Sequence, residues 1–178
     1  DALAQRREEL PVDIVQLDDG YQRAIGDWRD TNEKFSSTLP QLAERIREAG
    51  FTPGLWTAPF CVVGERRLFE QQSDWLLRSD PNDEDPFYRG TLHPVWAATG
   101  RVYALDPTRP EVLEHLRRLF SDLVEMGFHY LKLDFLHTVS GRARAADPRV
   151  SRAARLHRGL RAIREGAGDD AFLLGCGC

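Results

Sequence analysis

The chain has 178 residues, 42% of them apolar, and a net charge of −4 at pH 7. This length is enough for one domain with a sizeable core, and the mild charge predicts no nucleic acid and no anionic membrane as partner, because both call for a concentrated basic face. No apolar run approaches the length that crosses a bilayer, and the three cysteines do not form a disulfide framework, which favours a reducing, cytoplasmic location.

The start of the chain reads as a strand followed by a helix. Residues 13–20, DIVQLDDG, form a strand-like run that ends in acids and glycine. Apolar residues then recur at helical spacing from Leu39 to Ile46, and the pattern stops at Gly50. This order predicts one β-then-α unit.

A second strand is predicted over residues 51–60, FTPGLWTAPF, and it leads into a loop over residues 61–101. A loop of this length is usually either functional or disordered. Disordered segments are poor in aromatic residues. An ordered lid or rim is therefore favoured by the aromatic side chains of the loop, Trp75, Phe87, Tyr88 and Trp96.

The second half of the chain repeats the alternation. Residues 102–106 form a short extended piece, and Pro110 opens a helix whose apolar stripe ends at Gly127. The remaining predicted elements are a strand over 129–135, a helix over 153–163 and a last strand over 171–178. Strands that alternate with helices predict a parallel sheet with the helices outside it.

The predicted fold class is α/β, as part of a (β/α)8 TIM barrel. A closed barrel needs about 250 residues, which is more than the 178 present. We therefore expect residues 1–178 to form a partial barrel domain that is cut on both sides. The alternative is a small open sheet that is complete as it stands.

The strand HYLKLDF carries Lys132 and Asp134, whose side chains point the same way because side chains alternate along a strand. In a parallel α/β fold, ligands bind at the carboxyl ends of the strands. A core would also reject an unpaired acid. Asp134 is therefore the first candidate for chemistry, and the alternative is an internal Lys132–Asp134 ion pair that holds the strand end.

Other predicted strands also end in side chains that could serve a site, namely Asp18, Asp19, Trp56 and Cys176. In a barrel these ends converge on one face, where active sites are built. Each residue has a structural alternative. The two aspartates could form a turn with the following glycine, Trp56 could belong to the core, and Cys176 could be structural.

Two more polar residues invite a functional interpretation. Asp106 precedes a proline and is better explained as a turn residue at the start of a helix than as a catalyst. His137 lies three residues after Asp134, which raises the question of a metal, but one aspartate and one histidine make a weak metal signal.

Six segments in this order resemble the melibiase branch of glycoside hydrolase family 36, the α-galactosidases. They are LDDGYQ at 17–22, GDW at 26–28, GLWTAPF at 54–60, YALDPT at 103–108, LKLDF at 131–135 and LLGCGC at 173–178. The resemblance nearly spans the chain. It implies a retaining hydrolase that releases terminal α-linked galactose from galactosides or oligosaccharides with a catalytic (β/α)8 barrel, and it implies no cofactor and no metal.

Matched position by position, Asp134 resembles the catalytic nucleophile of the family and Lys132 the residue that hydrogen-bonds the sugar hydroxyls beside it. The resemblance further implies four substrate-binding residues: Asp18 and Asp19 for the distal hydroxyls of galactose, Trp56 as an aromatic wall and Cys176 as a pocket-lining side chain. The residue types agree with this, since a pyranose needs several hydrogen-bonding partners and an apolar face to stack against.

The general acid/base of this family is an aspartate in a motif beyond the GCG turn. Retaining hydrolysis needs two carboxyl groups, so residues 1–178 are expected to be inactive alone. Within the enzyme class, an α-N-acetylgalactosaminidase and a galactosyl transferase of the raffinose synthase type remain open. Outside it, the alternatives are a non-catalytic carbohydrate-binding fragment and a metal-dependent hydrolase with Asp18, Asp19, Asp134 and His137 as ligands.

Overall fold

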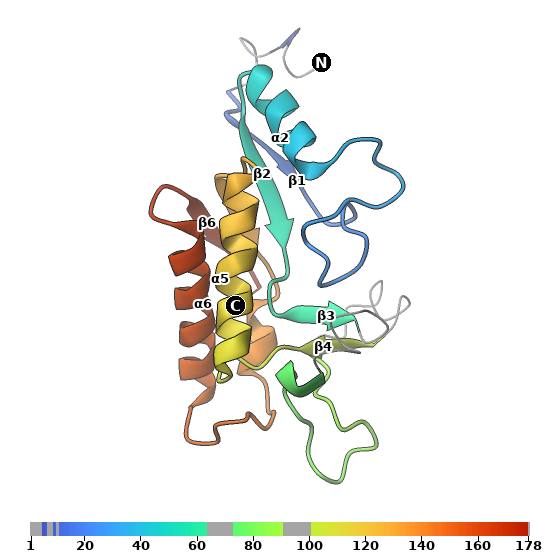
Figure 1. Ribbon diagram of the computed structural model, residues 1–178, viewed down its shortest axis with the longest axis vertical. Helices are drawn as coiled ribbons and strands as arrows, with labels where there is room; N and C mark the ends of the chain where they lie inside the picture. The colour runs from blue at the N-terminus through green and yellow to red at the C-terminus, as the bar shows by residue number, and fades with distance from the viewer. Residues whose placement is uncertain (1–4, 7–8, 10, 64–72, 91–100, 178) are drawn as a thin grey trace.

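The computed structural model describes residues 5–6, 9, 11–63, 73–90 and 101–177 (Figure 1). Within this part, one parallel sheet contains β1 (Ile14–Leu17), β2 (Thr52–Thr57), β5 (Tyr130–Leu133) and β6 (Phe172–Gly175) in that spatial order. The strands follow the order of the chain without a reversal. A doubly wound sheet reverses at a switch point, so this sheet is wound in one direction, as in a barrel.

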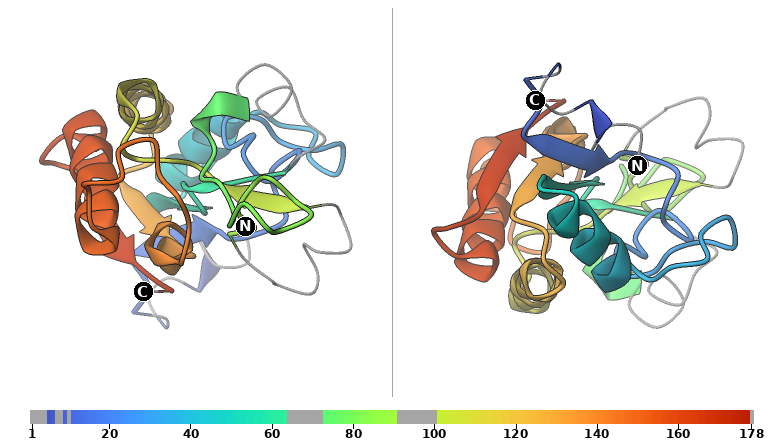
Figure 2. Two further views of the ribbon diagram at one scale, coloured as in Figure 1. Left: turned by 90° about the horizontal axis from the view of Figure 1, so that it is seen from below. Right: turned by 90° about the horizontal axis from the view of Figure 1, so that it is seen from above.

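The long helices of the described part lie along one side of the curved sheet (Figure 2). They are α2 (Leu39–Glu48), α5 (Pro110–Glu125) and α6 (Arg152–Ala167). Their starts follow local chemistry: the Ser151 hydroxyl accepts a hydrogen bond from the Ala154 N–H, and Pro110 occupies the first turn of α5. Gly50 and Gly127, which follow α2 and α5, have positive φ angles, so these helices end where the sequence predicts.

Residues 61–101 are wrongly predicted as one loop. β3 (Cys61–Val63) pairs in antiparallel fashion with β4 (Val102–Ala104) and forms a second, two-stranded sheet, and the 3-10 helix η1 (Ser73–Trp75) lies between them in sequence. Residues 102–106 therefore do not supply a barrel strand. The reason is that the free edge of β2 is taken by β5, from Gly54 opposite Tyr130 to Thr57 opposite Leu133.

Aromatic side chains of this region make packing contacts where the structure describes them. Trp75 and Phe87 pack against the core, and the ring of Phe87 contacts that of Tyr103 edge-on. Trp96, which the sequence also assigns to the rim, lies outside the described residues.

The two faces of the parallel sheet differ in what covers them. Leu55, Leu131 and Leu133 are buried on the helix-covered face. The concave face carries Trp56 and Lys132 at the same register level, and in a (β/α)8 barrel this is the interior. The exposed large apolar side chains of the described residues belong to this face or its margin, namely Val12, Ile14 and Phe172.

No helix in the described ranges has both the length and the apolar character needed to span a membrane.

The contact between α5 and α6 depends on a glycine. A Cβ atom at Gly166 would overlap the backbone carbonyl oxygen of Arg117, which cannot move away without shifting α5. The Nε of Arg117 also forms an ion pair with Glu165 at 2.6 Å. The two helices therefore approach closely where α6 carries no side chain.

We expect Gly166→Ala to lower the free energy of unfolding by about 1 to 3 kcal/mol, the usual cost of overpacking. At an exposed helix position the same substitution would stabilise the helix by about 1 kcal/mol, so the sign of the change tests the close packing. Urea unfolding of the full-length protein measures the change. The control is His157→Ala on the exposed side of α6, which should stay within about 0.5 kcal/mol of wild type. An unchanged Gly166→Ala protein would contradict the close packing.

Candidate active site

The carboxylate of Asp134 accepts hydrogen bonds from the next residue in the chain and from two neighbouring strands. The indole N–H of Trp56 on β2 donates to Oδ2 at 3.0 Å, and the backbone N–H of Phe135 donates to Oδ1 at 2.7 Å. The thiol of Cys176, just after β6, is a third donor. The parallel register that places Trp56 beside Lys132 brings these groups together.

These donors decide the charge of Asp134. Burial raises the pKa of its carboxyl group, but the hydrogen bonds from Trp56, Phe135 and Cys176 and the charge of Lys132 outweigh burial, so the pKa lies below its usual range. Asp134 is therefore ionised at neutral pH. An ionised carboxylate can act as a nucleophile or a base, but it cannot donate a proton.

The Cys176 thiol has the opposite behaviour. Burial raises its pKa, and the Asp134 carboxylate raises it further. The thiol therefore keeps its proton at neutral pH and serves Asp134 as a donor. This contact places Cys176 beside Asp134, and its role in lining a sugar pocket stays a prediction.

The backbone next to Asp134 is strained. Phe135 has φ 52° and ψ 37°, the left-handed region, which is rare for a bulky residue and costs about 1 to 3 kcal/mol. In this conformation the Phe135 N–H points back at the carboxylate of Asp134. A Cβ atom at Gly177 would lie 2.8 Å from Oδ1 of Asp134, so the glycine allows the β6 loop to close against the carboxylate.

Lys132 forms its ion pair with Asp18, at 3.0 Å from Nζ to Oδ2, and not with Asp134 as the structural alternative supposed. Burial lowers the pKa of Lys132, but the hydrogen bond and charge of Asp18 raise it above its ordinary value. The Lys132 and Asp18 side chains are 22% and 54% exposed, and such exposed pairs add little stability. The pair therefore orients two polar groups beside Asp134.

The residues after β1 form a turn and also contribute to the site. Oδ1 of Asp18 accepts the backbone N–H of Asp19 at 2.9 Å, and Gly20 has a φ of 108°. The Gln22 amide donates to Asp19 Oδ1 at 2.7 Å. The turn interpretation of the acid pair is therefore confirmed, and the turn presents Asp18 to Lys132. The role of the two aspartates in binding sugar hydroxyls stays a prediction.

Trp56 is 2% exposed and packs edge-on against Trp28, with ring centroids 5.6 Å apart. The core alternative for this residue is therefore confirmed. What it gives the site is its indole N–H, directed at Asp134. Its role as an aromatic wall for a sugar stays a prediction.

Two other residues have structural partners. His137 directs Nδ1 at the Gly177 carbonyl oxygen, 2.8 Å away, and the described residues contain no group of three His, Cys, Asp or Glu side chains suited to a metal ion. Asp106 is 1% exposed and accepts the Thr108 N–H at 2.9 Å, as expected of a turn residue before a helix.

Sequence reasoning missed the contributions of Phe135, Gly177 and Gln22. No local signal marks a left-handed phenylalanine, since its conformation depends on the surrounding packing. Gly177 stands in the GCG segment, and a glycine at a strand end could have indicated a close approach of the backbone.

Comparison with known proteins identifies the family. Residues 1–164 match the family model Melibiase, and the chain therefore belongs to the melibiase family. An α-galactosidase of Escherichia coli is 27% identical over 141 residues, which are 74% of this chain and 18% of that protein. The chain thus spans less than a fifth of the length of this relative.

Solved structures agree with the fold. TtGalA, an α-galactosidase of Thermus thermophilus in complex with stachyose, superimposes with a TM-score of 0.79 and 36% identity over 99% of this chain and 36% of that one. AgaA from Geobacillus stearothermophilus gives a TM-score of 0.69 at 23% identity and covers 98% of this chain and 24% of its own. The prediction of an α/β fold that is part of a (β/α)8 barrel is confirmed.

Loss of the indole donor should raise the pKa of Asp134. In the full-length protein, Trp56→Phe removes a hydrogen bond that lowers this pKa. If activity requires ionised Asp134, the acid limb of kcat/KM should move to higher pH, because that limb reports the free enzyme. The matched control is Trp75→Phe, whose ring packs against His115. An unshifted acid limb in Trp56→Phe would contradict the assignment.

Proposed function

We propose that the protein containing this chain is a retaining glycoside hydrolase that releases terminal α-linked galactose from galactosides. The observation that carries the proposal is the Asp134 carboxylate at the end of β5, held by donors from β2 and from the end of β6. The known relatives support the substrate class, since TtGalA was solved with stachyose and with p-nitrophenyl α-D-galactopyranoside.

In the proposed reaction, Asp134 attacks the anomeric carbon and forms a covalent glycosyl intermediate, which water then hydrolyses. The Trp56 and Phe135 N–H groups hold the two carboxylate oxygens in place, which limits the side-chain motion that would cost rate. These donors also stabilise the carboxylate when it leaves in the second step. Its low pKa makes Asp134 a better leaving group than an unperturbed carboxylate.

The proposed mechanism needs a second carboxyl group that protonates the departing oxygen, about 5 to 5.5 Å from the nucleophile. We assign this role to a residue in the part of the barrel after β6, as the family resemblance implies. Asp18 already forms an ion pair with Lys132 at 3.0 Å, and we assign it to sugar binding instead. These 178 residues therefore carry the nucleophile half of the catalytic pair.

In this proposal, the polar groups beside Asp134 bind the sugar. Asp18 and Asp19 offer carboxylate acceptors, and Lys132 offers a charged donor next to them. Hydrogen bonds to charged groups contribute about 1.5 to 3 kcal/mol each. The Lys132–Asp18 pair is partly exposed in the free chain, so it is accessible to sugar hydroxyls that could bridge the two residues.

Replacement of the nucleophile is the direct test. In the full-length protein, Asp134→Gly should lower hydrolysis of an aryl α-galactoside by about 10⁴-fold or more, and added azide should restore part of the rate in the vacated space. The azide attacks from the side of the missing carboxylate, so the product should be the β-galactosyl azide. The matched control, Asp169→Gly in the exposed turn after α6, should keep wild-type activity. Undiminished activity in Asp134→Gly would exclude covalent catalysis by this residue.

Asp18→Ala tests sugar binding separately from chemistry. Loss of this acceptor should reduce kcat/KM by at least about tenfold, while the melting temperature stays near that of wild type, because the pair with Lys132 is exposed. Asp13→Ala, near the opposite end of β1 and also exposed, is the control. A large drop in melting temperature with unchanged kcat/KM would favour a purely structural turn.

A further inference from the structure

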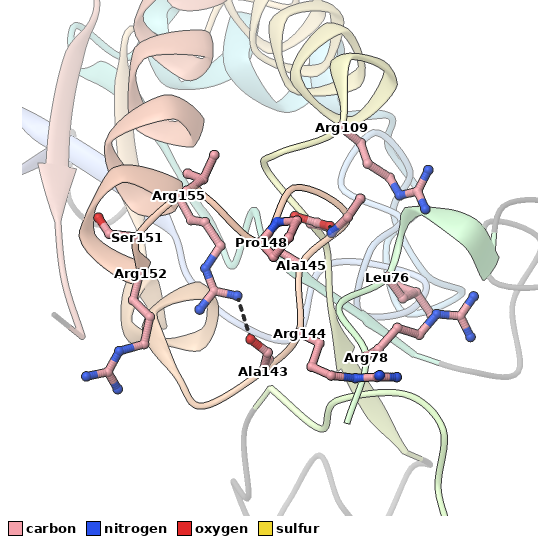
Figure 3. A pocket seen from close by; sticks show the side chains of 13 residues that line it. Leu76, Arg78, Arg109, Ala143, Arg144, Ala145, Pro148, Ser151, Arg152 and Arg155 are labelled. Atoms are coloured by element: carbon pink, nitrogen blue, oxygen red, sulfur yellow. Dashed lines mark hydrogen bonds between the residues drawn. The ribbon is translucent and has the colours of Figure 1, made fainter. Parts of the chain in front are cut away.

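A cavity lies apart from Asp134, between the N-terminal ends of α5 and α6 and the loop over residues 141–150. Its volume is about 650 Å³, within the range of small-molecule sites. Among its described lining residues are five arginines, shown as sticks in Figure 3: Arg78, Arg109, Arg144, Arg152 and Arg155. None of the residues placed around Asp134 lines it.

The acid in the described lining is Asp106, and its oxygens are already engaged. Oδ1 accepts the backbone N–H of Thr108 at 2.9 Å and the Thr108 hydroxyl at 2.8 Å. Oδ2 accepts the Ala146 N–H at 2.6 Å. The carboxylate therefore holds the loops together, and the lining keeps a strong excess of positive charge.

Arg155 is the most constrained of these arginines. The residue is 2% exposed, and its Nη atoms donate to the carbonyl oxygens of Ala143 and Gly141 at 3.3 and 3.0 Å. Its buried Nε has no hydrogen-bond partner among the described residues. Burial lowers the pKa of the Arg155 guanidinium, and the like charge of Arg152 lowers it further, whereas Asp106 acts the other way.

The other arginines are also weakly neutralised. Arg78 forms an ion pair at 3.5 Å with Asp74, whose side chain is 82% exposed. Arg144 donates to a neutral carbonyl oxygen, that of Ser79. In the described part of the chain, the buried Nε of Arg109 has no hydrogen-bond partner, and Arg152 forms no ion pair.

A buried cation without a counter-charge is unfavourable, and an anion in the cavity would relieve it. Guanidinium groups match phosphate oxygens in a bidentate geometry. The first turn of α6, which begins at Arg152, adds a partial positive charge that favours an anion. We propose that this arginine-lined cavity binds a phosphate group, either as inorganic phosphate or as the phosphate ester of a small molecule such as a hexose.

Isothermal titration calorimetry on the full-length protein tests the proposal with inorganic phosphate, glucose 6-phosphate and neutral glucose. We expect phosphate and glucose 6-phosphate to bind and glucose to be inert at this cavity. Tighter binding of glucose 6-phosphate would identify an ester as the ligand, and equal or tighter binding of phosphate would identify the free ion. Arg152→Gln should weaken both by about tenfold, because it removes one charged donor.

The control is Arg118→Gln on α5, whose side chain is 73% exposed and pairs with Glu114 outside the cavity. It should bind phosphate as wild type does, and so should Asp134→Gly, so that phosphate binding and galactoside hydrolysis can fail independently. No heat with either phosphate compound would overturn the proposal, as would binding that Arg152→Gln leaves unchanged. A change of oligomeric state in Arg152→Gln without loss of phosphate binding would instead assign the arginines to an interface and also overturn it.

Discussion

The structure depends on one constraint, the need to keep a partly buried carboxylate ionised. Asp134 achieves this with donors from its own backbone neighbour, from Trp56 on β2 and from Cys176 after β6. These groups meet only if three strands stand in parallel register. A slip of one residue would turn Trp56 or Cys176 to the other face of the sheet, and burial would then raise the pKa of the unpaired carboxyl.

The rest of the fold keeps that register. Leu55 and Leu131 pack beneath the helices on the convex face. The ring of Trp28, in the β1–α2 connection, packs edge-on against the ring of Trp56. The close contact of α5 with α6 at Gly166 brings together the helices that flank β5 in sequence. The strained Phe135 is partly buried and packs against the core, and its conformation directs its N–H at the Asp134 carboxylate.

The surroundings of Asp134 and those of Arg155 differ in how their charged groups are paired. Around Asp134, Asp18 and Lys132 form an ion pair at 3.0 Å, and neutral donors hold the Asp134 carboxylate. Around Arg155, the carboxylate of Asp106 already accepts hydrogen bonds from backbone N–H groups. The described lining of the cavity contains five arginines and this one acid. The first arrangement suits a neutral, polyhydroxylated ligand, and the second suits an anion. The two regions of this barrel segment thus differ in the charge they offer to a ligand.

The sequence by itself determined the parallel β/α alternation, the ends of α2 and α5 at glycines, and the strand-end positions of Asp18, Trp56, Lys132 and Asp134, because hydrophobic period and helix termination are local properties. Only the tertiary structure decided that residues 61–63 pair with 102–104, that Lys132 pairs with Asp18, that Trp56 gives the site an N–H from a buried ring, and that arginines distant in sequence enclose one cavity. These features depend on contacts between residues tens of positions apart, which the local pattern of a single chain does not encode.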